Sequence, residues 1–414
     1  MKEDEPRRGR ALWTIGALMV AAMLLDTGQA AAEPYMAIRE GRRCSTCHVN
    51  MSGPGKRTEL AITHLQEITH YKDLFPELAN ATDNFNGQIT RFFSIGSDLR
   101  VTDSVVLQDA PDANGDVKHA FGRSRVEENI FELRRGLAYA EVDLIPDYLL
   151  LYGDFQVTSG GSFVDREAFG LVKGLLPWKG YFKAGRFMPE YGLRTEDDDL
   201  FARDNDQNKL FVRGRTGTDF TDYQEGIEFG FEPGPFHFST SVTNGSSGTN
   251  TVRVTADVYT VLRDLPVVNN LLVGGSMLRN APTGSERIAF GFFAGSNLGP
   301  LEYQGEVDFI DDHTDATTGM NAQPAKTVGR FVTYGELNYL AFGWVNCKAF
   351  GEYSDHDGDP ATMGDDAQNR FGIGVEPFIG RYLQPRLFFS VANGVHSRPE
   401  DNQDRVVMEF HFFF

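Results

Sequence analysis

The chain has 414 residues, a formal net charge of -19 at pH 7 and a mean hydropathy of -0.32. The negative charge excludes nucleic acid as a partner, because phosphate binding needs a basic face. Three cysteines, two of them in one short motif, exclude a disulfide framework and leave Cys347 as a free thiol. The length fits one small module followed by one long β-barrel.

Residues 1–32 have the three-part pattern of a secretory signal peptide. Arg7, Arg8 and Arg10 precede an apolar run over residues 11–25, and three alanines follow at 30–32. The run is shorter than the roughly 20 apolar residues of a spanning helix, so we expect cleavage after residue 32 rather than an N-terminal membrane anchor.

A short cysteine motif follows the signal peptide. The run Cys44-Ser45-Thr46-Cys47-His48 is the C-x-x-C-H pattern, which attaches one haem c by two thioethers and supplies an imidazole to its iron. On a helix, positions three and four apart share a face, so both sulfurs can reach the haem while the histidine ring points at iron. Cys44, Cys47 and His48 are therefore the predicted cofactor-binding residues, and residues 33–86 are predicted to form a small helical monohaem cytochrome c module.

The second iron ligand has several candidates, because histidine or methionine would serve. Thr58 to about Tyr71 has the composition of a helix, and we rank His64 first as the second metal ligand. His70, Met51 and Met36 are the alternatives, as is five-coordinate iron.

The segment that flanks the motif is basic, although the whole chain is acidic. Its five cations are Arg39, Arg42, Arg43, Lys56 and Arg57. We expect them to pair with the haem propionates or with an acidic barrel interior, or else to form a solvated basic patch.

Residues 87–414 read as a transmembrane antiparallel β-barrel. Runs of about ten residues alternate between apolar and polar positions and are separated by turns rich in Gly, Asp and Asn. Leu301, Tyr303, Val307 and Phe309, for example, alternate with acidic and amide residues. A barrel escapes hydropathy scans because only one face of each strand meets lipid. Cys347 falls on the lipid-facing side of its run.

About sixteen strands are predicted, and fourteen or eighteen are the alternative counts. Their expected centres lie near residues 94, 137, 152, 171, 184, 228, 239, 257, 275, 291, 306, 335, 350, 374, 388 and 409. A barrel of this size can hold an aqueous lumen or a small plug.

The joins between strands differ in length, and this difference predicts orientation. Short joins at 176–180 and 233–235 should be periplasmic. Long polar joins at about 103–126, 193–223, 311–327, 355–368 and 396–404 should be extracellular. Several are acidic and could hold Ca²⁺ or Fe²⁺, although a solvated loop is the simpler interpretation. These acidic residues are Asp197, Asp198, Asp199, Asp204, Asp206, Asp311, Asp312, Asp355, Asp357, Asp359, Asp365 and Asp366.

The chain ends in an alternating strand with Met408, Phe410, Phe412 and the terminal Phe414 on one face. Such an ending resembles the signal recognised by the machinery that assembles outer-membrane barrels. Both ends of the barrel should be periplasmic, so the module should lie at the periplasmic mouth or inside the lumen. The lumen-facing acids that would attract its cations are Asp143, Asp154, Asp257, Glu302, Glu306, Asp308 and Glu376.

The run over residues 32–41, AEPYMAIREG, stands two residues before Cys44 and resembles the segment leading into the haem motif of the fused monohaem cytochrome-porins. The order of signal, single haem motif and barrel of about sixteen strands is similar as well. Met36, Ile38 and Arg39 replace the aromatic, Arg and Gln of that family, so the chain resembles a divergent branch. The resemblance implies an outer-membrane protein associated with Fe(II) oxidation.

Three alternative functions are consistent with these sequence features. The first is electron transfer between an extracellular donor such as Fe(II) and a periplasmic c-type cytochrome, with an Fe(II) oxidase type of activity. The second is a solute porin whose haem-bearing module is a plug or redox gate. The third, a sheath around another cytochrome, is disfavoured because a sheath needs no haem of its own.

Overall fold

The computed structural model describes residues 34–53, 55–62, 71–74, 76–77, 80, 85–108, 123, 125–157, 163–193, 223–245, 252–281, 285–314, 325–355, 367–380, 382–394 and 402–414. Its short helices are α2 (Pro34–Arg39), α3 (Cys44–Cys47) and α5 (Tyr71–Leu74). No helix among these residues is long and apolar enough to cross a membrane.

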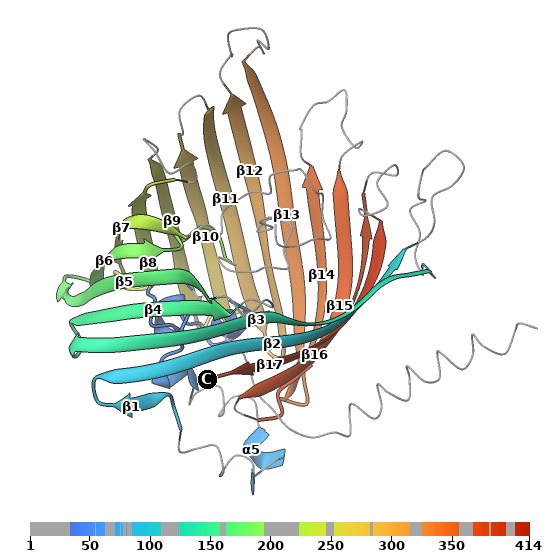
Figure 1. Ribbon diagram of the computed structural model, residues 1–414, viewed down its shortest axis with the longest axis horizontal. Coiled ribbons are helices and arrows are strands. Elements are labelled where there is room, and N and C mark those ends of the chain that lie inside the picture. Colours follow the sequence, from blue (N-terminus) through green and yellow to red (C-terminus); the bar gives the residue numbers. More distant parts are fainter. Residues whose placement is uncertain are drawn as a thin grey trace, which may run out of the picture.

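The strands are β1 (Gln88–Thr90), β2 (Phe93–Gln108), β3 (Arg125–Ile145), β4 (Leu149–Val157), β5 (Phe163–Leu176), β6 (Gly180–Phe187), β7 (Gln224–Phe231), β8 (Phe236–Thr243), β9 (Arg253–Arg263), β10 (Asn270–Asn280), β11 (Ser285–Leu298), β12 (Leu301–Thr314), β13 (Lys326–Ala341), β14 (Val345–Asp355), β15 (Gln368–Pro377), β16 (Leu383–Asn393) and β17 (Gln403–Phe413). Figure 1 shows them as one continuous curved sheet.

The sheet closes into a barrel of sixteen antiparallel strands. Each strand from β2 to β17 pairs with the next, and β17 pairs back with β2 from Asp404 opposite Leu107 to Phe413 opposite Asp98. β1 is a short addition beside the start of β2. The predicted barrel and its strand count are confirmed, and all sixteen predicted strand centres lie within β2 to β17.

Alternation along each strand separates an apolar outer face from a polar inner face. In β4, the outward Leu151 and Phe155 are 46% and 45% exposed, whereas the inward Leu150 and Asp154 are 0% and 2% exposed. Cys347 is exposed on the outer face, as its place in the alternation predicted. A closed barrel with this polarity leaves no unpaired sheet edge around the ring and offers an apolar surface to lipid.

Short turns gather at one end of the barrel, here called the short-turn end. The predicted short joins are confirmed there, at residues 177–179 between β5 and β6 and at residues 232–235 between β7 and β8. The barrel also begins and ends there, because Ser97 and Phe414 exchange backbone hydrogen bonds of 3.1 Å next to the start of β2.

The boundaries of the long joins were predicted wrongly, since several strands extend into the segments that were expected to be loops. β2 continues to Gln108, and β12 includes Asp311 and Asp312. Asp312 is no loop ligand, because it pairs with Arg287 at 2.6 Å and with Arg330 at 2.9 Å. Asp355 closes β14. The other predicted acidic loop residues, those from 197 to 206 and from 357 to 366, lie outside the described residues.

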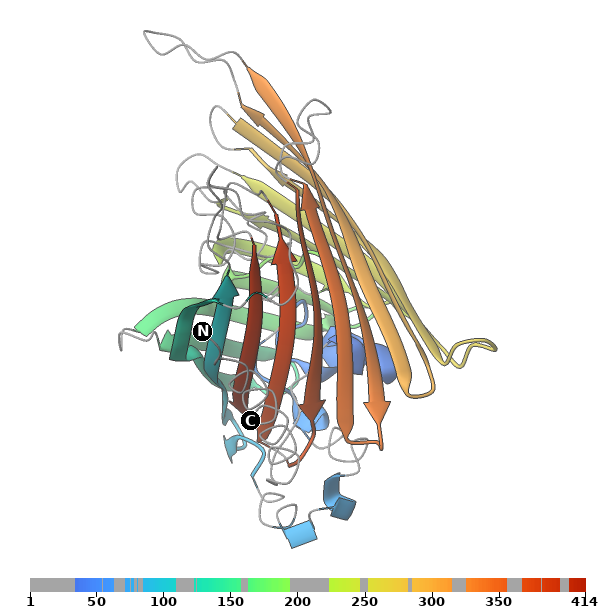
Figure 2. The ribbon, with the colours of Figure 1, turned by 90° about the vertical axis from the view of Figure 1, so that its right-hand side faces the viewer.

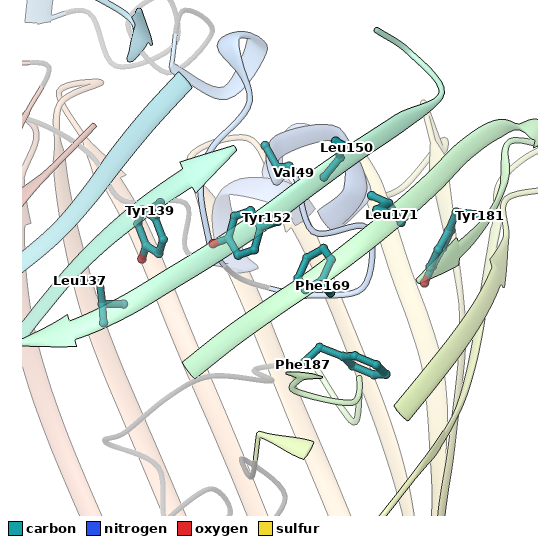
Figure 3. Packing of buried hydrophobic residues seen from close by; sticks show 9 residues of the cluster. All are labelled: Val49, Leu137, Tyr139, Leu150, Tyr152, Phe169, Leu171, Tyr181 and Phe187. Carbon is teal, nitrogen blue, oxygen red and sulfur yellow. The ribbon is translucent and has the colours of Figure 1, made fainter. Parts of the chain in front are cut away.

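The segment over residues 34–53 and 55–62, here called the plug, lies within the ring close to the short-turn end (Figure 2). Its helix α2 contacts β10, β11 and β12. On another side, Val49 packs against the inner faces of β3 to β6 (Figure 3). Contacts with several separate parts of the ring fix the plug inside the barrel rather than beside it.

Candidate functional site

The plug carries the predicted haem motif on one tight helical turn. Helix α3 spans Cys44 to Cys47, and the His48 backbone N–H donates to the Cys44 carbonyl at 3.0 Å. Both cysteines are free and half-buried, so neither is consumed in a disulfide. The structure thus places the three predicted residues Cys44, Cys47 and His48 together, on the plug inside the lumen.

The His48 ring is held in an orientation that suits an iron ligand. Its Nδ1 lies 3.2 Å from the Gly55 carbonyl oxygen, which leaves Nε2 for coordination. Burial, and next the positive charge of Arg57, lower the pKa of His48 to about 4. The imidazole is therefore neutral at physiological pH, as a metal ligand must be.

The two thiols are poorly suited to thiolate chemistry. Burial, with Glu190 next in weight, raises the pKa of Cys44 to about 12, and burial also raises the pKa of Cys47. Metal thiolate binding and thiol exchange need the deprotonated form, so both are disfavoured. Thioether bonds carry no charge and fit this surrounding.

Two guanidinium groups beside Cys47 supply charge that a haem propionate would use. Arg42 and Arg57 both act electrostatically on Cys47, and the buried Nε of each has no hydrogen-bond partner among the described residues. Arg57 also stacks over the Phe413 ring at 3.9 Å. Unsatisfied buried donors of this kind fit an anionic carboxylate, so the residues present fit a covalently bound haem.

The candidates for the second iron ligand separate into two groups. Met36 is buried among Tyr35, Phe378 and Phe413, and Met51 packs on the inner wall near Val49. Both methionine side chains are therefore committed to packing contacts with the barrel. His64 and His70 lie outside the described residues. The predicted helix that carries them begins at residue 59, and Thr58 caps it by accepting from the Ala61 N–H at 3.2 Å.

A buried network on β5, β6 and β7 fastens the plug to the wall. Lys183 Nζ donates to Asn50 Oδ1 at 3.0 Å and to Ser52 Oγ at 2.5 Å, and it pairs with Glu228 at 2.8 Å. Asn50 Nδ2 donates in turn to both Glu167 carboxylate oxygens at 3.3 Å. Since these groups are almost fully buried, undocking the plug would leave charges without partners.

A second network reaches Ser45, one of the two residues between Cys44 and Cys47. Glu232, just after β7, accepts from the Ser45 hydroxyl and pairs with Arg43 at 3.2 Å. The His237 ring lies between carboxylates, with Nδ1 at 3.4 Å from Glu232 and Nε2 at 3.0 Å from Glu190. The wall therefore positions helix α3 through direct side-chain contacts.

The segment after β6 also crosses the interior. Residues 187–193 are all buried. The Met188 N–H donates to Glu167 at 3.0 Å, the Gly192 N–H to Ser276 at 2.8 Å and the Leu193 N–H to Glu306 at 3.0 Å. These bonds reach β5, β10 and β12, so this segment narrows the lumen further.

The expected attraction between basic module and acidic interior is present. Lys56 pairs with Glu141 at 2.9 Å and Arg43 with Glu232, while Arg39 donates to the Pro300 carbonyl at 2.9 Å. Six of the seven predicted lumen-facing acids are buried on the inner face, and Asp143 is half-buried near the mouth. The residues that hold the plug were missed, however: Glu141, Glu167, Lys183, Glu190, Glu228, Glu232 and His237. Alternation placed most of them on the inner face but did not single them out.

The barrel is similar to outer-membrane porins of known structure. The anion-selective porin from Comamonas acidovorans aligns at 12% identity with a TM-score of 0.51, covering 78% of this chain and 99% of that one. The outer-membrane channel DcaP of Acinetobacter baumannii aligns at 10% identity with a TM-score of 0.52, covering 80% and 100%. OprB of Pseudomonas putida aligns at 9% identity with a TM-score of 0.52, covering 78% and 94%. No family model and no curated protein matches the sequence. The fold class is thus a sixteen-stranded, porin-like β-barrel.

Proposed function

We propose that the chain is an outer-membrane electron-transfer protein with one haem c on Cys44 and Cys47. Electrons pass between an extracellular donor such as Fe(II) and a periplasmic c-type cytochrome through a haem enclosed at the short-turn end. The observation that carries the proposal is the C-x-x-C-H turn held inside the lumen by buried contacts from several strands. A porin-like barrel with an apolar outer face supports the membrane location.

The haem, when bound, supplies the reversible one-electron chemistry. His48 offers Nε2 to the iron while its Nδ1 is held by the Gly55 carbonyl. Arg42 and Arg57 would balance the propionates. One haem cannot bridge a hydrocarbon core of about 30 Å alone, so a small donor must enter from the long-loop end and a carrier protein must approach the short-turn end.

Rapid mixing with Fe(II) tests the proposal directly. Oxidised, haem-loaded protein should show the absorption bands of reduced haem as each Fe(II) gives one electron to the haem iron. Dithionite serves as the control because it reduces any accessible haem. Reduction by dithionite without reduction by Fe(II) would exclude Fe(II) as the donor.

A solute porin with a haem-bearing plug is the second candidate, favoured by the porin-like fold. Removing residues 33–86 should raise single-channel conductance in planar bilayers several-fold, because the plug occupies the lumen at the short-turn end. The full chain should conduct poorly. Equal conductance of both proteins would show that the plug does not limit flow, and an open full-length channel would favour solute transport.

His64→Ala should convert the haem from low-spin, six-coordinate iron to high-spin, five-coordinate iron if His64 is the second ligand. The measurement is the absorption spectrum of the reduced protein, with His70→Ala as the matched control. An unchanged low-spin spectrum in both variants would direct attention to Met51 and Met36.

A further inference from the structure

The peptide group between Gly55 and Lys56 makes a hydrogen bond at each of its two ends. Its carbonyl oxygen lies 3.2 Å from His48 Nδ1, and since a carbonyl can only accept, the imidazole N–H is the donor. Its N–H donates to the Tyr152 hydroxyl oxygen at 3.1 Å. The carbonyl and the N–H belong to one rigid plane, so the barrel wall and the proposed iron ligand hold the same group from opposite sides.

The turn that carries this peptide fits closely against the wall. The Val49 N–H donates to the Lys56 carbonyl at 2.9 Å, which ties the two ends of residues 49–56 together. Gly55 has a φ of +102°, and a Cβ there would lie 2.5 Å from the Tyr152 hydroxyl oxygen. Only glycine therefore lets the backbone approach the tyrosine this closely.

Tyr152 is held by the barrel and not by the plug. It lies on the inner face of β4, and its ring stacks on Phe169 with 4.8 Å between centroids (Figure 3). Its hydroxyl group has a further side-chain hydrogen bond, to the buried carboxylate of Asp154. Asp154 Oδ1 also accepts from the Glu167 backbone N–H at 2.8 Å, which fixes the carboxylate on the wall.

These hydrogen bonds form one continuous chain from the His48 imidazole to the Asp154 carboxylate. Each donor points away from His48, so each bond polarises the next. The negative charge at the far end makes the Gly55 carbonyl a stronger acceptor. A stronger acceptor at Nδ1 makes Nε2 of the same ring a more basic ligand.

We propose that Tyr152 and Asp154 are positioning residues of the barrel wall that set the reduction potential of the haem through His48. A more basic imidazole favours ferric over ferrous iron, so the chain holds the potential below the value that the plug alone would give. The wall thus acts on electron transfer besides enclosing the plug. The inference rests on the haem proposed above.

The reduction potential of the haem-loaded, full-length protein tests this inference. Tyr152→Phe keeps the stacked ring but breaks the chain. It should raise the potential by about 30 mV, which is a change of about threefold in the equilibrium at about 59 mV per tenfold for one electron. The matched control is Tyr181→Phe, because Tyr181 is an equally buried inner-wall tyrosine whose hydroxyl donates to Glu228. The control should leave the potential unchanged, and heat-modified electrophoresis confirms that each variant is a folded barrel.

A double-variant cycle separates the chain of bonds from a direct effect of charge. Asp154→Asn removes the terminal charge and should also raise the potential. In the Tyr152→Phe background the chain is already broken, so Asp154→Asn should add little there. Additive shifts would show that the carboxylate acts through space, and they would contradict the proposal.

The His48 ring supplies a second measurement. In the ferric protein, the hyperfine-shifted NMR signal of its Nδ1 proton should move in Tyr152→Phe and stay in place in Tyr181→Phe. A haem-bearing protein with the same potential and the same Nδ1 signal in wild type and Tyr152→Phe would overturn this inference and leave the proposed function standing. A chain that binds no haem would overturn the proposed function, and this inference with it.

Discussion

Replacing both Cys44 and Cys47 by alanine should abolish covalent haem while the barrel still assembles. In the proposed haem site the two thiols would supply the covalent attachment, whereas the sixteen strands pair independently of them. Haem-stained denaturing gels measure the loss, and heat-modified electrophoresis measures the barrel. Cys347→Ala is the matched control, because this outward cysteine stands far from the motif in the sequence and should leave the haem stain intact.

A full haem stain in the double variant would end the haem assignment. Loss of both the stain and the folded barrel would instead show that the strands need haem in order to assemble. We do not expect this result, because the contacts between plug and wall are made by side chains alone. Each single variant should keep a reduced stain, because the remaining thiol can still form one covalent thioether.

Lys183→Met should loosen the plug strongly. Lys183 is fully buried, and its loss leaves Glu228 without its cation and Asn50 and Ser52 without their donor. Breaking a buried ion pair from one side costs about 3–5 kcal/mol. Faster proteolysis of the plug in an otherwise folded barrel is the expected result.

Two matched variants sharpen this experiment. Glu228→Gln added to Lys183→Met removes the unpaired charge and should recover part of the protection. Lys179→Met alters an exposed lysine in the turn before β6 and should change nothing. Equal proteolysis of wild type and Lys183→Met would show that the plug is held by its apolar contacts instead.

The barrel was predictable because its signal is local and repeated. Alternation such as that from Leu149 to Gln156 defines which face is inside, and all sixteen strand centres follow from it. Strand ends were less predictable, because the polar residues of the inner face near the end of a strand resemble the polar residues of a loop. Asp311 and Asp312 therefore look like loop residues, although they lie in β12 and pair with β11.

The candidate site likewise has one part that could be predicted from the sequence and one part that could not. Cys44, Cys47 and His48 are adjacent in sequence, so their geometry is set by one helical turn and can be predicted from spacing. The partners of the plug are set by the register of distant strands. Inward alternation could not show that Lys183 meets Asn50, 133 positions away in the chain.

The pairing of β17 with β2 has a consequence for the order of events during biogenesis. The plug is made first, yet Arg57 and Met36 rest on Phe413, in the last strand to be made. Contacts between such distant parts of a chain form slowly. Because these contacts join the plug to the last strand, closure of the ring encloses the plug and its two half-buried thiols within the barrel. If haem is attached as proposed above, its attachment is expected before ring closure, so a shortage of haem during synthesis would yield barrels that later supply could not repair.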